Sequence, residues 1–146
     1  MSGISEFPRI EISLLYKAVD QSFRNALKKS FPDITTAQEL VLRILRFQGD
    51  MYQTELAMHT GQDRNNLSRT ISILIKKNFV QKKNLPADKR YQLVSITSKG
   101  LNTHEKIFAI MEKWRKEIFF KEISLEELVA FNETFKKLIA NLKVNN

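Results

Sequence analysis

Residues 64–76 carry side chains that suit recognition of a nucleic acid, at spacings that place them along one face of a predicted helix. They are Arg64, Asn65, Ser68, Arg69, Ser72 and Lys76. Arginine can pair with guanine and asparagine with adenine, while hydroxyl and ammonium groups bind backbone phosphates. The chemistry that this face favours is therefore noncovalent binding of a nucleic acid. For this segment alone, an ordinary amphipathic surface helix is the alternative interpretation.

Apolar residues in the same segment predict the helix that positions this polar face. Its buried side is formed at spacings i, i+4, i+7 and i+8 by Leu67, Ile71, Leu74 and Ile75. Asp63 is expected to cap the first turn of this helix. Residues 53–60 predict a shorter helix with Leu56 and Ala57 facing inward, and Gly61 suits a tight turn between the two helices. The segment is therefore predicted to be a helix-turn-helix.

A basic hairpin is predicted to follow. Two strand-like runs, residues 79–83 and 91–96, are joined by residues 84–90, in which Pro86 and Asp88 indicate a hairpin tip. The cations of this region are Lys82, Lys83, Lys89 and Arg90. A charged hairpin beside a helix with an Arg/Asn/Ser face predicts a winged helix-turn-helix that combines phosphate contacts with groove reading.

Residues 55–100 resemble the core of the MarR family of bacterial transcriptional regulators. The matching motifs are Glu-Leu-Ala at 55–57, Arg69-Thr70, the Lys-Lys-x-hydrophobic-Val run at 76–80, Asp88-x-Arg90, and the return from Leu93 to Gly100. Asn78 stands where the family commonly has glycine, and asparagine tolerates the left-handed conformation required there. Asn65 and Asn66 lie where family members differ, so a preferred DNA sequence cannot be carried over.

The pattern and the resemblance together predict a mainly α fold with a small β-hairpin wing, in one continuous domain. Its expected parts are an N-terminal dimerisation helix within residues 1–34, a winged helix-turn-helix lobe at 35–97, and C-terminal dimerisation helices at 98–146. The expected DNA-binding residues are Thr36, Thr54, Arg64, Asn65, Asn66, Ser68, Arg69, Lys76, Lys83, Asp88, Lys89 and Arg90.

Five of these residues have more specific expected roles. Arg69 is assigned to base edges, and Arg90 to a minor groove beside the core site. The resemblance implies that Asp88 orients Arg90, with simple turn formation as the alternative. Thr36 and Thr54 stand near predicted helix starts, where they either hold a phosphate or only cap the helix. The helix near Thr36 is expected to run to about residue 47, capped by Thr35 or Thr36, with Glu39 at the capping-box spacing from Thr36.

The terminal segments carry more apolar surface than one small domain readily covers. Residues 10–29 predict a helix, and Thr97 or Ser98 starts another that continues to about residue 119. Ser124 is expected to cap the last helix, with Glu127 closing a capping box. Its apolar residues are Leu125, Leu128, Val129, Phe131, Phe135, Leu138, Ile139 and Leu142. These helices predict a homodimer interface, and packing within one chain is the alternative.

Composition favours a polyanionic partner. The 146-residue chain has 24 Lys and Arg against 16 Asp and Glu, a formal charge of +8. Between Lys76 and Arg90 there are six cations and one anion. Double-stranded DNA is the partner that such a basic segment favours.

Residue types for catalysis are sparse. The chain has no cysteine, its four glycines form no phosphate-binding loop, and its only histidines, His59 and His104, lack metal-ligand spacing. We therefore expect no enzyme activity, no metal and no cofactor, with both histidines at the surface or partly packed and the acidic residues solvated. No apolar run predicts a membrane span, and no signal-peptide core is found. The expected location is the bacterial cytoplasm, at the nucleoid when the protein is bound to DNA.

The predicted function is sequence-specific regulation of transcription, most simply repression, by a homodimer that binds a pseudopalindromic operator. The resemblance implies relief by a small aromatic or phenolic effector. The candidate effector-binding residues are Tyr16, Phe23, Phe47, Phe108 and Met111, for which core packing is the alternative. The alternative function is a winged-helix module that binds another protein without reading a DNA sequence.

Overall fold

The computed structural model describes residues 9–85 and 88–144 of the chain. Its elements are α1 (Arg9–Lys28), α2 (Thr36–Gln48), β1 (Met51–Tyr52), α3 (Gln53–Thr60), α4 (Arg64–Lys76), β2 (Val80–Leu85), β3 (Asp88–Ile96), α5 (Ser98–Trp114), the π-helix Arg115–Phe119 and α6 (Leu125–Val144). The mainly α fold with a winged helix-turn-helix is therefore confirmed. The chain divides into two compact units, the first ending at Trp114 and the second beginning at Arg115.

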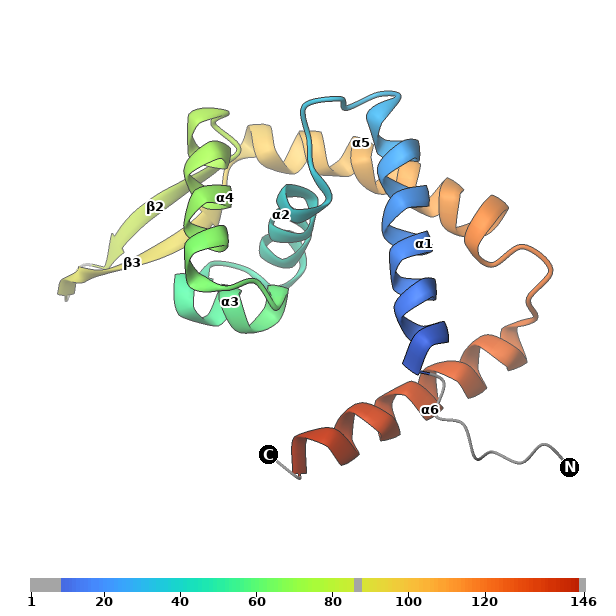
Figure 1. Ribbon diagram of the computed structural model, residues 1–146. Helices are drawn as coiled ribbons and strands as arrows, with labels where there is room; N and C mark the ends of the chain where they lie inside the picture. The colour runs from blue at the N-terminus through green and yellow to red at the C-terminus, as the bar shows by residue number, and fades with distance from the viewer. Residues whose placement is uncertain (1–8, 86–87, 145–146) are drawn as a thin grey trace, which may run out of the picture. The chain divides into compact units, whose positions relative to one another are not determined.

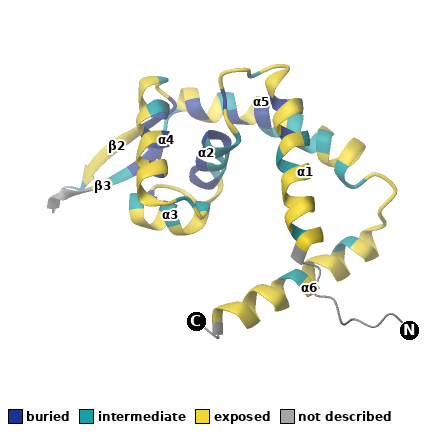
Figure 2. Ribbon diagram, viewed as in Figure 1, coloured by how far each residue is buried: buried dark blue, intermediate teal, exposed yellow. Residues whose placement is uncertain are grey.

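Helix α2 is the centre of the first unit. It contacts α1, α3, α4, α5 and β3 (Figure 1). Its apolar residues Val41, Leu42 and Leu45 are fully buried, because they repeat at a spacing that keeps them on the inner side of the helix. Figure 2 shows this concentration of buried residues on α2. The helices that flank α2 are thereby held around one apolar core.

The wing is part of a three-stranded antiparallel sheet with the strand order β1-β3-β2. Strand β1 was absent from the sequence prediction, because two residues are too few to show a periodicity. It is held by pairing of Met51 with Val94, which lie far apart in the sequence. The hairpin strands are also longer than predicted: β2 continues to Leu85 and β3 begins at Asp88. Cross-strand pairing, such as that of Asn84 with Gln92, extends them into the predicted tip.

Two local predictions around α2 and α4 were wrong, those for Ile75 and for the Glu39 capping box, and the open choice of the α2 cap is decided by the structure. Ile75 is 36% exposed, and Thr70 instead completes the buried side of α4. Thr35, and not Thr36, is the N-cap of α2, because its hydroxyl oxygen accepts from the backbone N–H of Gln38 at 3.2 Å. Glu39 forms no capping box with Thr36, since its carboxylate is buried inside the first unit.

Helix α5 starts against the base of the wing. The backbone N–H of Gly100 donates to Thr97 Oγ1 at 3.0 Å, and Thr97 Oγ1 lies 2.6 Å from the carbonyl oxygen of Asn78. A Cβ atom at Gly100 would lie only 2.1 Å from the carbonyl oxygen of Phe79. Only glycine therefore permits this close approach of α5 to the end of α4. Asn78 itself has a φ of 59°, which confirms the expected left-handed exit from the helix.

The second unit contains the π-helix and α6. The predicted helix to residue 119 is α-helical only to Trp114 and continues as the π-helix. The predicted capping box at Ser124 is confirmed, since the N–H of Ser124 donates to Glu127 Oε2 at 2.7 Å and the N–H of Glu127 donates to Ser124 Oγ at 3.2 Å. Within the described part of the chain, no helix has the length and apolar character needed to cross a membrane.

Candidate nucleic-acid interface

The start of helix α4 is fixed by Asp63. Its Oδ1 accepts hydrogen bonds from the backbone N–H groups of Asn65 at 3.0 Å and Asn66 at 2.9 Å. The Asn66 N–H contributes most to lowering the pKa of Asp63 below its ordinary value of 3.8. The carboxylate therefore carries its charge at neutral pH and neutralises the free amides of the first turn. This predicted cap is confirmed.

Helix α4 presents a continuous polar surface opposite its buried side. Leu67, Ile71 and Leu74 are buried, whereas the side chains on the other faces are exposed (Figure 2). The exposed residues are Arg64, Asn65, Asn66, Ser68, Arg69, Ser72 and Lys76. The structure thus brings the predicted α4 residues onto accessible faces of one helix. Arginine, amide and hydroxyl groups at such positions have the chemistry of base-edge and phosphate binding.

The side chains of this surface are not equally available. The Asn66 amide donates to Asp63 Oδ2 and so completes the cap. Ser72 Oγ donates to the carbonyl oxygen of Ser68 at 2.9 Å, which turns its hydroxyl toward the helix backbone. Asn65 and Arg69, spaced one helical turn apart, are among the exposed side chains that the cap and these bonds leave for an external partner.

The turn between α3 and α4 fixes the angle between these two helices. Gly61 has a φ of 65°, so the predicted left-handed turn residue is confirmed. Thr60 Oγ1 donates to the carbonyl oxygen of Leu56 at 2.8 Å and lies 3.3 Å from the N–H of Gln62. These local bonds and the fully buried Leu56 hold α3 against α4.

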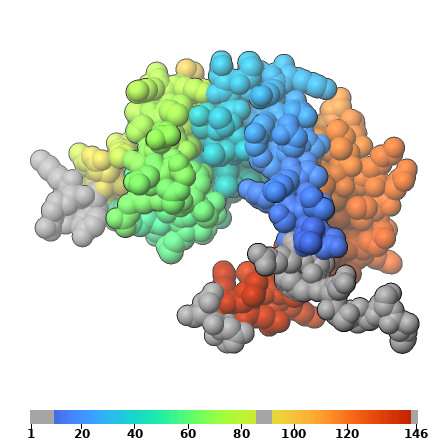
Figure 3. Space-filling model, in the orientation of Figure 1, coloured from blue at the N-terminus to red at the C-terminus, as the bar shows by residue number. Residues whose placement is uncertain are grey.

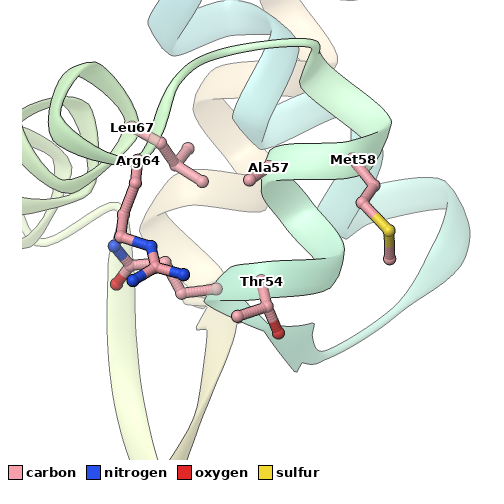
Figure 4. Close-up of a pocket in the computed structure, with 6 residues that line it drawn as sticks. Thr54, Ala57, Met58, Arg64 and Leu67 are labelled. Carbon is pink, nitrogen blue, oxygen red and sulfur yellow. The ribbon is translucent and has the colours of Figure 1, made fainter.

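A shallow cavity of about 400 Å³ lies between α3 and α4 on the side that carries Thr54 and Arg64 (Figure 4). Thr54 is exposed in the first turn of α3, whose start is closed by the N–H of Tyr52 donating to Glu55 Oε2 at 2.8 Å. Met58 also lines this cavity and is 77% exposed. Met58 was not predicted from the sequence, because a single methionine on a short helix shows no periodicity.

The wing adds exposed cations from strand β2. Lys82 and Lys83 are both exposed, and Lys83 Nζ lies 3.2 Å from Asp50 Oδ2. A solvent-exposed ion pair of this kind contributes little stability, so a phosphate oxygen can replace Asp50 at small cost. Asp88, Lys89 and Arg90 start strand β3, but their side chains lie outside what the structure describes. Figure 3 shows the surfaces of α3 and α4 adjoining the described part of the wing.

Thr36 is placed differently from the other predicted DNA-binding residues. It is half-buried in the first turn of α2 and lines a second cavity of about 420 Å³ in the first unit. Three of the predicted effector-binding residues, Tyr16, Phe23 and Met111, also line this cavity. The structure therefore brings these three together with Thr36 at the junction of α1, α2 and α5.

Phe47 and Phe108 do not line that cavity. Their ring centroids lie 5.6 Å apart, and the Arg46 guanidinium stacks over both rings at 5.3 Å and 5.4 Å. These contacts place the two rings around a polar cluster between α2 and α5. Their spacing in the sequence could not distinguish this packing from a position in the cavity.

His104 is the centre of that cluster and is fully buried, which corrects the expectation of a surface or partly packed residue. His104 Nε2 lies 3.3 Å from Glu39 Oε1, and Nδ1 lies 3.3 Å from Arg46 Nη1. Glu39 is 2% exposed, so its carboxylate is not solvated as predicted, and Arg43 Nε lies 3.6 Å from the same oxygen. Among residues 9–85 and 88–144, no group of three or more His, Cys, Asp or Glu side chains could hold a metal ion.

Comparisons with known proteins agree with this geometry. The sequence profile of the MarR family matches residues 34–91, which include the helix-turn-helix and most of the wing. No curated protein matches the sequence.

Solved structures match nearly the whole chain. A mutant of MarR from E. coli, solved in complex with operator DNA, is 26% identical with a TM-score of 0.74, covering 92% of this chain and 99% of that one. A structure described as transcriptional regulator PA4135 is 27% identical with a TM-score of 0.79, covering 92% and 98%. BpsR from Bordetella bronchiseptica, whose DNA binding is regulated by 6-hydroxynicotinic acid, is 24% identical with a TM-score of 0.80, covering 94% and 96%.

Proposed function

We propose that the chain is a winged helix-turn-helix DNA-binding transcriptional regulator of the MarR family, whose profile matches residues 34–91, and that it acts as a homodimeric repressor of a pseudopalindromic operator. Proteins of this family are regulators rather than enzymes. The observation that carries the proposal is the exposed face of α4, with Asn65 and Arg69 presented one turn apart beside the basic wing. In this proposal α4 reads base edges, while Thr54, Lys76 and Lys83 bind phosphates.

The remaining DNA-binding assignments rest on the sequence and the family resemblance. We assign Arg64, Asn65, Asn66 and Ser68 to the neighbourhood of the base edges, and Thr36 to a phosphate at the start of α2. The wing residues Asp88, Lys89 and Arg90 complete the proposed surface, with Arg90 in the minor groove. The structure of a MarR mutant from E. coli in complex with operator DNA, 26% identical to this chain, supports DNA as the partner of such a surface.

Exposed apolar residues on α1 and α6 support the proposed homodimer. On α1 they are Ile10, Leu14 and Leu15, and on α6 they are Leu125, Val129, Phe131, Leu138, Ile139 and Leu142. Each unit on its own exposes such residues, and their burial in a two-fold interface would contribute about 25 cal/mol per Å² of apolar area. Two chains related in this way would present two α4 helices to successive major grooves, about one helical turn apart.

We also propose control by a small aromatic effector bound in the cavity of about 420 Å³ between α1, α2 and α5. Tyr16, Phe23 and Met111 supply aromatic and polarisable walls there. The regulation of BpsR by 6-hydroxynicotinic acid supports an effector of this general type. An effector can release DNA only by binding more tightly to the form that does not fit the operator.

Selection from a pool of random DNA duplexes tests the proposed function. The purified protein is expected to enrich an inverted repeat whose half-sites are centred about 10 base pairs apart. The variant Arg90→Ala should bind both the selected and unrelated duplexes more weakly and show a smaller salt dependence. Recovery of no common sequence would refute sequence-specific regulation and favour a winged-helix module that binds another protein.

A further inference from the structure

A third cavity of the first unit, which we call the lysine cavity, lies at the end of α4 opposite Asp63. Its volume is about 380 Å³, and it is lined by the loop between α1 and α2, the exit from α4 and the first turns of α5. It shares no lining residue with the cavity beside Thr54 or with the cavity between α1, α2 and α5. Cavities of about 300–1,000 Å³ are typical of small-molecule sites.

Two lysines from different elements bring their ammonium groups to the lysine cavity. Lys77, the C-cap of α4, contacts the carbonyl oxygen of Asp33 through Nζ, which also lies 3.2 Å from Gln38 Oε1. Lys99, in the first turn of α5, donates from Nζ to the carbonyl oxygen of Lys77 at 3.0 Å. All of these acceptors belong to uncharged groups. The bonds therefore position the two ammonium groups without cancelling their positive charge.

The chain around the lysine cavity is basic. The segments that line it are residues 28–34, 77–79 and 99–103, which together contain four lysines and one acidic residue. Two of these lysines lie at the end of α1, and both are exposed. A concentration of one sign of charge attracts ions of the opposite sign. These segments therefore favour an anion, and one with two charges over one with a single charge.

The remaining wall of the lysine cavity is mainly apolar. Phe79 and Ile34 are buried, and Phe31 packs against the core from a partly buried position. Lys99 Nζ lies 5.2 Å from the centre of the Phe79 ring, so the charged and apolar walls adjoin each other. A ligand complementary to both walls has an apolar part directly beside its anionic group.

We propose that the lysine cavity binds a small phosphate monoester whose organic part is apolar or aromatic. At neutral pH such an ester carries a charge of about −1.5 to −2 and three strong acceptor oxygens. These oxygens accept from Lys77 and Lys99, and the hydroxyl groups of Ser30 and Thr103 line the same cavity. The organic part lies against Phe79. This site is additional to the DNA-binding surface and to the proposed effector cavity.

Equilibrium dialysis of the intact protein tests the ligand chemistry with three probes at about pH 8, above the second pKa of the ester near 6. Phenyl phosphate is the full probe, phenyl sulfate keeps its shape with one charge, and inorganic phosphate keeps its charge without the ring. Phenyl phosphate should bind about tenfold more tightly than either of the others. Equal or tighter binding of phenyl sulfate or inorganic phosphate, or no retention of phenyl phosphate, would overturn the proposal.

Substitution of Lys99 tests the location of the site. Lys99→Met removes the ammonium group and keeps an unbranched side chain, so the affinity for phenyl phosphate should fall about tenfold or more. Lys106→Met is the matched control, because Lys106 is exposed on the same helix and does not line the cavity. It should bind phenyl phosphate within about twofold of wild type.

A second variant keeps this test decisive if Lys99→Met does not fold, as judged by circular dichroism. Thr103→Val removes a lining hydroxyl and keeps the shape of the side chain, so the affinity for phenyl phosphate should fall about threefold or more. Wild-type affinity in folded Lys99→Met, or in Thr103→Val if Lys99→Met is unfolded, would overturn the proposed site.

Operator titrations distinguish a small phosphate ester from the backbone phosphates of DNA. If the occupant is a small molecule, Lys99→Met should bind the selected operator with the affinity and salt dependence of wild type. A weaker operator complex, with the slope of log affinity against log salt reduced by about one, would assign the site to DNA and overturn the proposal. If the protein binds phenyl phosphate through Lys99 but binds no duplex, the proposed function fails and the lysine cavity stands.

Discussion

Arg69 extends from the middle of the exposed face of α4, one turn beyond Asn65. The helix buries Leu67 and Ile71 on its other side, so rotation of α4 about its axis is fixed by the core. The direction in which Arg69 points into a major groove occupied by α4 is thereby fixed. A guanidinium in that position can form two hydrogen bonds with the O6 and N7 atoms of guanine.

Replacement of Arg69 by alanine tests this assignment. Arg69→Ala should weaken binding to the selected operator by about 1–3 kcal/mol and reduce discrimination at one base pair of each half-site. Competition gel-shift assays with operators mutated at single positions measure both effects. Lys106→Ala, which removes an exposed cation from α5, is the control. A loss of affinity that is equal for operator and random DNA would contradict base reading by Arg69.

His104 shows where residue-level prediction from the sequence failed. No pattern in the sequence indicates that His104 on α5 contacts Glu39 and Arg46 on α2, because 65 and 58 positions separate these partners. Helical periodicity describes one helix at a time and cannot predict a polar pair formed between two helices. The family resemblance also could not identify the pair, since neither histidine was among the motifs that carried it.

Substitution of His104 should therefore lower the free energy of unfolding. His104→Ala leaves a cavity in the core and removes the ring that contacts the buried Glu39 carboxyl, so we expect the free energy of unfolding to fall by about 2–5 kcal/mol. Urea denaturation followed by circular dichroism measures this loss. His59→Ala is the control, because His59 is exposed on α3. A similar small effect of both substitutions would mean that the buried contact contributes nothing to stability.

At the scale of elements, the helices were predictable wherever a cap or an amphipathic spacing lies within one segment. Asp63, Gly61, Asn78 and Ser124 each act through backbone groups within a few positions, and each expected conformation or cap is present. Strand β1 was not predictable, because its two residues are ordered only by pairing with β3. The choice of Thr35 over Thr36 at the start of α2 was likewise undetermined, since adjacent hydroxyls are equally good caps.

The Asp63 cap predicts a specific pH dependence of the stability of α4. Its pKa is lower in the folded protein because backbone N–H groups, that of Asn66 above all, donate to the carboxylate. The charged cap therefore stabilises the fold above the ordinary pKa of 3.8, and this contribution is lost as the pH falls through the lower folded pKa. Asp63→Asn keeps an oxygen that caps the helix but does not titrate.

Thermal unfolding at a series of acidic pH values compares the two proteins. Below pH 3.8, the Tm of the wild type should fall more steeply than that of Asp63→Asn. At neutral pH the difference should be small and should decrease with added salt, because the carboxylate interacts with the partial positive charge of the helix start. Parallel curves over the whole acidic range would show that the Asp63 hydrogen bonds do not depend on its charge.

At the scale of the whole molecule, the proposal requires that two chains act on one duplex. Burial of the apolar residues exposed on α1 and α6 would favour a dimer. The polar and basic side chains of α3, α4 and the wing would favour binding of DNA. The sequence predicted both surfaces from apolar content and charge. The two-fold homodimer is a proposal, because an exposed apolar face indicates an interaction surface without specifying the symmetry of the complex.

Sedimentation velocity of the protein with its selected operator duplex, at increasing salt, tests this central claim most directly. We predict a complex of two chains per duplex whose affinity falls by about 10³ to 10⁵ between roughly 50 and 200 mM salt, as expected for some six to ten phosphate contacts. The protein without DNA should already sediment as a dimer. A monomer that binds no duplex even at about 50 mM salt would contradict the account.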